Sequence, residues 1–101
     1  MIYDFKLDYG DKNTGTVYLP DKHDGKYSVI IYSHGWDGNR NPGAVLQKLL
    51  GENIALVTFD YYGCGETGGD YSKMTYCRWK NNLRDILDWV IEQPFADLSR
   101  R

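Results

Sequence analysis

Apolar residues in the first part of the chain follow the patterns expected of strands. Residues 2–9 alternate between largely polar and apolar positions, which predicts a half-buried strand. Residues 14–19 resume this pattern after a polar turn and stop at Pro20. The side of the first strand that we expect to be buried carries Tyr3, Phe5, Leu7 and Tyr9. The two strands are predicted to form an antiparallel hairpin.

Two later runs are apolar at nearly every position. Val29–Ser33 and Ile54–Phe59 show no helical spacing, and they end at the polar residues His34 and Asp60. Such runs are typical of strands that are buried on both faces of a parallel sheet, where ligands collect beyond the strand ends. We therefore expect two buried parallel strands, with functional interest at the turn that begins with His34.

Apolar residues spaced three and four apart predict two helices. The first is capped by Asn41, ends at Gly51 and connects the two parallel strands. Its apolar face is predicted to carry Val45, Leu46, Leu49 and Leu50. The second and longer helix is capped by Thr75 or Ser72 and ends before Pro94. Its face, which we expect to be core and not a partner site, carries Trp79, Leu83, Ile86, Leu87, Val90 and Ile91.

Length, charge and cysteine content limit the class of protein. At 101 residues the chain forms at most one domain, residues 1–101, and its 42% hydrophobic and 26% charged content is typical of a globular protein. The net charge of -2 argues against nucleic acid and anionic membranes as partners. We see no signal peptide and no run of the ~18 apolar residues that span a bilayer, so we expect a cytoplasmic protein with reduced cysteines. His23, Cys64 and Cys77 lack the spacing of zinc ligands, and we expect no metal or cofactor.

A glycine-rich segment raises a rival function. Residues 63–68 formally match the GxGxxG fingerprint of dinucleotide-binding sites. In that fingerprint the loop opens a helix directly, and an acidic residue follows about 20 residues later on the next strand. Here residues 70–72 intervene, and Asp85 and Asp88 lie on the predicted helix. A dinucleotide-binding module is therefore an alternative that the pattern does not favour.

Three signatures, in order along the chain, resemble the N-terminal half of the α/β-hydrolase family. His34–Asn39 is similar to the family's His-Gly turn after its third strand, and Asp60–Thr67 is similar to its DxxGxGxS loop after the fourth. Asp85–Val90 is similar to the helix that follows. With the predicted order of elements, the resemblance covers nearly the whole chain. The glycine loop and residues 76–82 are most similar to cinnamoyl or feruloyl ester hydrolases and to serine aminopeptidase-like members.

The resemblance implies an α/β fold: a partial α/β-hydrolase sheet of an N-terminal hairpin plus two parallel strands, with two main helices, in a three-layer sandwich truncated before the nucleophile strand. In acyl transfer two backbone N–H groups stabilise the oxyanion. One of them would belong to Trp36, in a turn made sharp by Gly35. His34 would brace this turn, because the family's catalytic base follows the nucleophile. Asp60 would bond to the amides of the loop that contains Gly63 and Gly65.

The resemblance also implies residues that this sequence does not supply. Family members carry the nucleophile in a G-x-S-x-G turn, followed by the acid and the histidine. The four serines, none of which has these flanking glycines, are Ser28, Ser33, Ser72 and Ser99. Cys64 lacks them too, so a Cys–His pair with His34 or His23 is not favoured. We expect the catalytic triad beyond Arg101 and the chain to be inactive alone.

These expectations lead to one principal hypothesis and one from another class. The principal hypothesis is the N-terminal part of an α/β-hydrolase that acts on carboxylic esters or peptides and supplies half of the oxyanion hole. Its partner would be the C-terminal half of the hydrolase, or another chain, pairing with the exposed edge of Val29–Ser33. A small acyl substrate would bind only in the complete enzyme. The alternative is a non-catalytic binding remnant or subunit.

Overall fold

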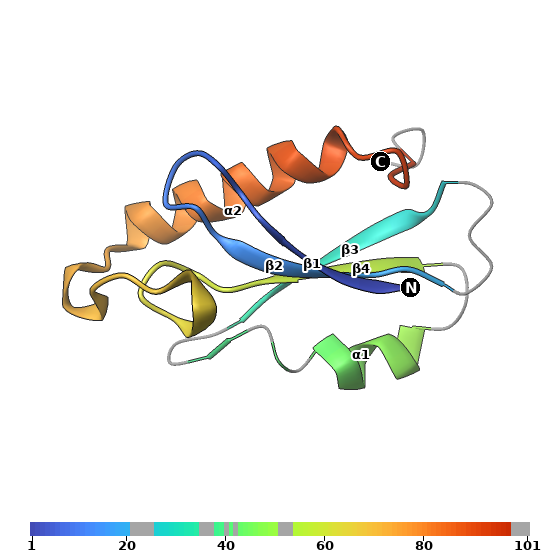
Figure 1. The fold of residues 1–101 in the computed structure, drawn as a ribbon, viewed down its shortest axis with the longest axis horizontal. Helices are drawn as coiled ribbons and strands as arrows, with labels where there is room; N and C mark the ends of the chain where they lie inside the picture. The colour runs from blue at the N-terminus through green and yellow to red at the C-terminus, as the bar shows by residue number, and fades with distance from the viewer. Residues whose placement is uncertain (21–25, 35–37, 40, 42, 51–53, 98–101) are drawn as a thin grey trace.

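The computed structural model describes residues 1–20, 26–34, 38–39, 41, 43–50 and 54–97. Within these ranges the chain forms one mixed sheet with a helix on each face (Figure 1). The strands are β1 (Ile2–Lys6), β2 (Thr14–Tyr18), β3 (Ser28–Ser33) and β4 (Ile54–Phe59), and the helices are α1 (Gly43–Leu50) and α2 (Tyr76–Ile91). Two short 3-10 helices, η1 (Gly65–Thr67) and η2 (Tyr71–Lys73), lie between β4 and α2. The predicted α/β class and three-layer arrangement are confirmed.

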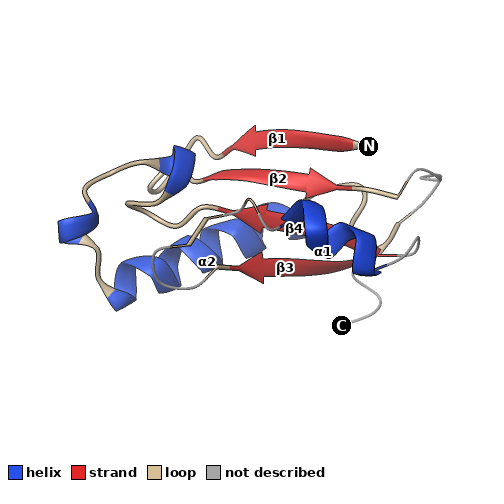
Figure 2. Cartoon of the chain, turned by 90° about the horizontal axis from the view of Figure 1, so that it is seen from below, coloured by secondary structure: helices blue, strands red, loops and turns tan. Residues whose placement is uncertain are grey.

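The strands lie in the order β1-β2-β4-β3 (Figure 2). The strands β1 and β2 form the predicted antiparallel hairpin, and β2 also pairs antiparallel with β4. The strands β3 and β4 are parallel along their full length, from the pair Ser28 and Ile54 to the pair Ser33 and Phe59. Both parallel strands therefore end at the same edge of the sheet, with His34 directly after β3 and Asp60 directly after β4.

The main core lies between the sheet and α2. Its buried residues are Leu7, Val17, Leu19, Ala55, Val57, Phe59, Tyr61, Ile86, Val90, Phe95 and Ala96. Phe5 of β1 stacks on Trp89 of α2, with ring centroids 3.9 Å apart. Tyr9, predicted on the same buried side as Phe5, is instead 41% exposed. Because β1 ends at Lys6, the turn carries Tyr9 over α2, where its hydroxyl donates to the backbone oxygen of Asp85 at 3.1 Å.

Strand β3 is not buried on both faces, in contrast to the prediction. It lies at the end of the described strand order, and Ile30 is 42% exposed. The helix α1 approaches the sheet over β2 and β4, where a Cβ added at Gly43 would lie 2.7 Å from the Tyr18 ring and 2.8 Å from the Thr58 methyl group. Cover on this face is therefore centred away from β3. A strand that is apolar on both faces is buried on both only where an element of the fold covers each face.

Helix α2 faces the core with part of the predicted apolar face. Its buried residues are Asn82, Ile86 and Val90. The exposed fractions of Leu83, Leu87 and Ile91 are 38%, 49% and 43%. Ile86 and Val90 of the predicted face are thus in the core, and the side of that face that carries Leu83, Leu87 and Ile91 is not. The prediction that the whole apolar face is core is wrong, because the leucine side extends beyond the sheet that the described strands provide.

The predictions for the ends and faces of the two helices are confirmed in part. Thr75 caps α2, since its side-chain oxygen accepts the N–H of Arg78 at 3.1 Å. Ser72 instead belongs to η2. Asn41 lies before α1, and Gly51 is outside the described residues. Val45 is 65% exposed, so its predicted place on the buried face of α1 is wrong; the contact of Gly43 with the sheet sets the orientation of α1.

Candidate functional site

The ends of the two parallel strands are joined by a histidine. His34 is 3% exposed and Asp60 is fully buried. The Nε2 atom of His34 accepts the backbone N–H of Tyr61 at 3.0 Å, which fixes the end of β3 to the residue that follows Asp60. This bond therefore fixes the position of the residue that follows β3. Parallel pairing of two strands with polar ends brings these residues together.

Aromatic rings enclose His34. The centroid of its ring lies 4.9 Å from that of Tyr61 and 5.5 Å from that of Trp79, in both cases edge to face. The rings of Tyr61 and Trp79 are stacked on each other, with centroids 4.2 Å apart. Because Nε2 is an acceptor, the neutral ring carries its proton on Nδ1. A proton on Nε2 would point at the Tyr61 N–H and break the bond between the strand ends. The arrangement therefore supports a bracing role for His34 and opposes proton transfer at Nε2.

The residues expected to follow His34 in the site are Gly35 and Trp36. Both lie outside the described residues, as does His23. Among the described residues, no cluster of three or more His, Cys, Asp or Glu side chains could hold a metal ion. Cys64 is buried, Cys77 is exposed, and neither forms a disulfide. In the described part of the chain, no helix is long and apolar enough to cross a membrane.

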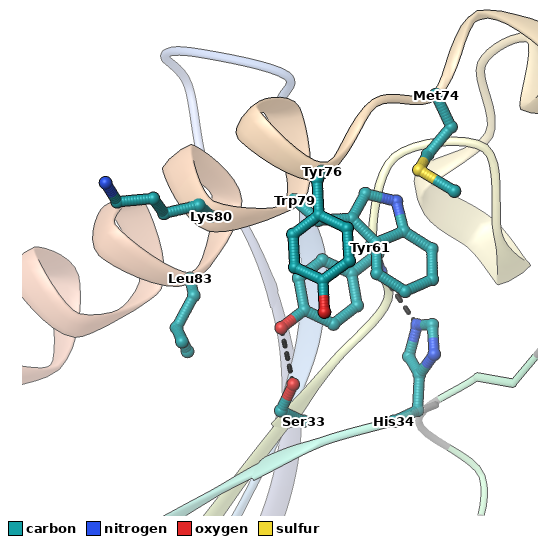
Figure 3. Close-up of a pocket in the computed structure, with 8 residues that line it drawn as sticks. All are labelled: Ser33, His34, Tyr61, Met74, Tyr76, Trp79, Lys80 and Leu83. Atoms are coloured by element: carbon teal, nitrogen blue, oxygen red, sulfur yellow. Dashed lines mark hydrogen bonds between the residues drawn. The ribbon is translucent and has the colours of Figure 1, made fainter. Parts of the chain in front are cut away.

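A cavity of about 480 Å³ opens beside the end of β3 (Figure 3). It is lined by Ser33, His34, Tyr61, Met74, Tyr76, Trp79, Lys80 and Leu83. The hydroxyl groups of Ser33 and Tyr61 are hydrogen-bonded to each other on its wall. The apolar walls and few polar groups are typical of sites that hold small organic ligands. This cavity was not predicted from the sequence, although Tyr76, Lys80 and Leu83 have the spacing that places them on one side of a helix.

The carboxylate of Asp60 holds the glycine loop. Its Oδ2 atom accepts the N–H of Glu66 at 3.1 Å. Gly65 has a φ of +50°, and a Cβ at this position would lie 2.4 Å from the Asp60 carboxyl carbon. Gly63 has a φ of +83°, and a Cβ there would lie 2.9 Å from Cα of Tyr71. The loop therefore requires glycine at both positions to close over the acid.

Several backbone amides of the glycine loop donate to other atoms of the loop. The N–H of Gly63 bonds to the oxygen of Gly68 at 2.6 Å, that of Cys64 to Tyr61 at 3.0 Å, and that of Gly68 to Cys64 at 3.3 Å. The helix that follows Cys64 is the three-residue η1 and not a long helix. A phosphate cradle needs amides that point at the ligand from the start of a helix. The geometry thus opposes the dinucleotide-binding alternative.

A polar network ties the loop to α2 and to the hairpin. Asn82 accepts the N–H of Tyr62 at 2.8 Å and donates to Asp11 at 2.9 Å. Arg78 makes two bonds to the same Asp11 carboxylate, at 3.0 and 2.9 Å, and its guanidinium lies 3.5 Å from the centre of the Tyr62 ring. The bond from Arg78, more than that from Asn82, lowers the pKa of Asp11. Asn82 was not predicted as a core residue, although an amide between Trp79 and Ile86 in an apolar stripe is a visible sequence signal.

The chain is similar to parts of several known proteins, although no protein-family model matches it. It is 33% identical over 73 residues to the mitochondrial palmitoyl-protein thioesterase ABHD10 of Mus musculus, covering 69% of this chain and 25% of that protein. It is 27% identical over 77 residues to a 31.7 kDa protein of the traX-finO intergenic region of Escherichia coli, covering 74% of this chain and 27% of the relative. This chain thus spans about a quarter of the length of these curated relatives.

Solved structures match a larger share of the chain. Est1E from Butyrivibrio proteoclasticus, determined with ferulic acid bound, matches 92% of this chain with a TM-score of 0.81 and 24% identity. The α/β hydrolase GrgF from Penicillium sp. sh18 matches 96% with a TM-score of 0.73 and 17% identity. The matches cover 39% of the Est1E chain and 34% of the GrgF chain. The likeness establishes the fold, of which this chain holds the hairpin, the two parallel strands and two helices.

Proposed function

Since the chain has the fold of the N-terminal part of an α/β-hydrolase, we propose that it serves in an enzyme that hydrolyses carboxylic esters or thioesters. One observation carries the proposal. The buried His34, directly after β3, accepts the Tyr61 N–H and lines an apolar cavity of about 480 Å³. This fixes His34, the residue that precedes Gly35 and Trp36 in the sequence, beside a space suited to an acyl group.

The proposed chemistry is stabilisation of an oxyanion. When a nucleophile attacks an ester, negative charge develops on the carbonyl oxygen, and fixed N–H donors lower the energy of that state. We assign one donor to the backbone N–H of Trp36, with Gly35 allowing the sharp turn and His34 holding its base. The nucleophile, acid and catalytic base are assigned to a part of the enzyme other than this chain. The role of this chain is therefore electrostatic stabilisation and positioning.

The substrate class is proposed from the cavity and from the relatives. Aromatic and aliphatic side chains of Tyr61, Trp79 and Leu83 form the wall, which favours an apolar acyl group. The mouse relative is a palmitoyl-protein thioesterase, and the Est1E structure holds ferulic acid. A palmitoyl group and ferulic acid both have a carboxyl-derived carbon attached to a larger, mainly carbon body. We therefore propose carboxylic acyl substrates before peptides.

The test needs a complete hydrolase. In a fusion protein, residues 1–101 replace the matching segment of Est1E, and hydrolysis of p-nitrophenyl acetate and methyl ferulate is measured. The substitution Trp36→Pro removes the proposed amide donor and is expected to lower kcat by about 100- to 1000-fold. The matched variant Trp36→Phe keeps the N–H and is expected to retain most of the activity. Equal kcat values for these two variants would contradict the assignment.

A second experiment uses the isolated 101-residue chain. We expect the 101 residues to hydrolyse p-nitrophenyl acetate no faster than the Cys64→Ala variant does. Activity of the isolated chain that is lost in Cys64→Ala would identify a thiol nucleophile and overturn the proposal. A fusion protein that folds but hydrolyses no ester or thioester would instead support the non-catalytic binding alternative.

A further inference from the structure

The cavity beside the end of β3 has a single cationic side chain among its described lining residues. This residue is Lys80, and none of the described lining residues is an aspartate or a glutamate. Within the described part of the chain, the ammonium group of Lys80 forms no ion pair or hydrogen bond. The cavity therefore offers a positive charge that the described residues do not neutralise.

The neighbours of Lys80 on α2 explain why its charge lacks a partner. Side chains three and four positions apart on a helix are the ones that meet. At these positions around Lys80 the helix carries Tyr76, Cys77, Leu83 and Arg84, none of which is acidic. Asp85 instead lines a separate cavity of about 400 Å³ together with Asp11 of the hairpin turn. An anion that enters the larger cavity would thus meet Lys80 without competition from a carboxylate on these neighbouring positions.

The polar groups of the cavity are separated by a mainly apolar wall. Figure 3 shows the imidazole of His34 and the ammonium group of Lys80 on opposite sides of the rings of Tyr61 and Tyr76. The hydroxyl groups of Tyr61 and Ser33 bond to each other, which lowers their need for a partner on a ligand. A ligand that fits this wall has a polar group at each end and a carbon chain or ring between them.

We propose that the cavity selects acyl groups that carry a carboxylate at the end remote from the ester. The ester carbonyl lies at the His34 end, the carbon chain lies against the aromatic rings, and the carboxylate pairs with Lys80. A few placed polar groups in an apolar pocket fix the orientation of a ligand and select among ligands. The substrates are then half-esters or half-thioesters of dicarboxylic acids. The hydrolytic step rests on the proposed function, whereas binding of the anion by Lys80 does not.

Two esters of the same shape isolate the contribution of the charge. Hydrolysis of monomethyl adipate consumes water, breaks the bond between the acyl carbon and the methoxy oxygen, and releases methanol, adipate and a proton. Methyl 6-methylheptanoate has an isopropyl group in place of the far carboxylate and reacts at the same bond. Because Lys80 is exposed, we expect its charge to change the ratio of kcat/KM for the two esters by about two- to fivefold.

The Est1E fusion protein tests the selection. Lys80→Met should lower the ratio of kcat/KM for the anionic over the neutral ester by about two- to fivefold, Lys80→Glu should lower it further, and Lys80→Arg should retain it. Lys48→Met, on α1 at the opposite face of the sheet, changes the net charge equally and should leave the ratio unchanged. The effect of Lys80→Met should disappear in 1 M NaCl, where the screening length is about 3 Å. An unchanged ratio in Lys80→Met at low salt, or an equal loss in Lys48→Met, would overturn the proposal.

Binding to the 101-residue chain separates this inference from catalysis. In an NMR titration with monomethyl adipate, the amides of Trp79, Lys80 and Leu83 should shift, and Lys80→Met should raise the Kd by about two- to fivefold. Shifts confined to other parts of the chain, or the same Kd in Lys80→Met, would contradict the proposed site. In the fusion protein, Trp36→Pro should lower kcat for both esters alike and leave their ratio unchanged. Loss of the charge preference and loss of the proposed activity are therefore separate results.

Discussion

Replacing Asn82 with alanine should destabilise the chain more than any change at its exposed neighbours. Asn82 is 1% exposed and bonds both the Tyr62 N–H and the Asp11 carboxylate. Alanine leaves a partly buried N–H without its acceptor, at about 1–3 kcal/mol, and removes a donor from a charged acceptor, at about 1.5–3 kcal/mol. Since Arg78 still pairs with Asp11, we expect a net loss of about 2–4 kcal/mol. For a domain of this size that lowers the thermal midpoint by about 10–25 °C.

Scanning calorimetry at pH 7 measures this loss, with Asn81→Ala as the matched control. Asn81 is exposed on the same helix, and alanine there should be neutral or slightly stabilising. The variant Asn82→Asp keeps an acceptor for Tyr62 but sets a second carboxylate against Asp11. Its pKa would be raised in the folded state, so stability should recover as the pH falls from about 6 to 4. A difference below about 0.5 kcal/mol between Asn82→Ala and Asn81→Ala would refute the reasoning.

Three further predictions concern other parts of the fold. Burial first, and then the charges of Asp88 and Asp11, raise the pKa of Asp85. The charged carboxylate therefore destabilises the fold at pH 7, and Asp85→Asn should stabilise the chain there by up to about 1 kcal/mol. The original chain should gain stability as the pH falls through this pKa, and the variant should lack that gain. Gly65→Ala should cost about 2–4 kcal/mol in denaturant unfolding, because the methyl group meets Asp60 at a positive φ; an unchanged midpoint would contradict this contact. Thr75→Ala should cost about 1 kcal/mol of α2 capping and Thr75→Ser much less, and equal losses would count against the cap.

Local patterns predicted the elements that depend on local chemistry. The bounds of β4 are those of the uninterrupted run Ile54–Phe59, and α2 begins after Thr75, one of the two predicted caps. The hairpin followed from alternation and a polar turn. Parallel pairing of β3 and β4 then placed His34 and Asp60 at one edge of the sheet.

The errors concern features set by neighbours that are distant in sequence. Whether Ile30 is buried depends on how far α1 reaches across the sheet, and whether Leu87 is buried depends on how many strands lie beneath α2. Nothing local to either residue specifies these conditions. The acceptor role of His34 Nε2 likewise depends on the position of the Tyr61 amide, which only the folded strand ends define. The sequence signal for Asn82 was present, but its partners lie on two other segments.

The two edge strands of the described sheet, β1 and β3, differ in how readily they can pair with a strand of another chain. β1 presents Asp4 and Lys6 among its five residues, whereas Ser28–Ser33 presents no charge. Copies of the isolated chain that associate by sheet extension should therefore pair through β3. In the resulting dimer, the edge strands at both ends of the joined sheet would be the charged β1 strands. Self-association should stop at two chains and should not propagate into open-ended fibrils.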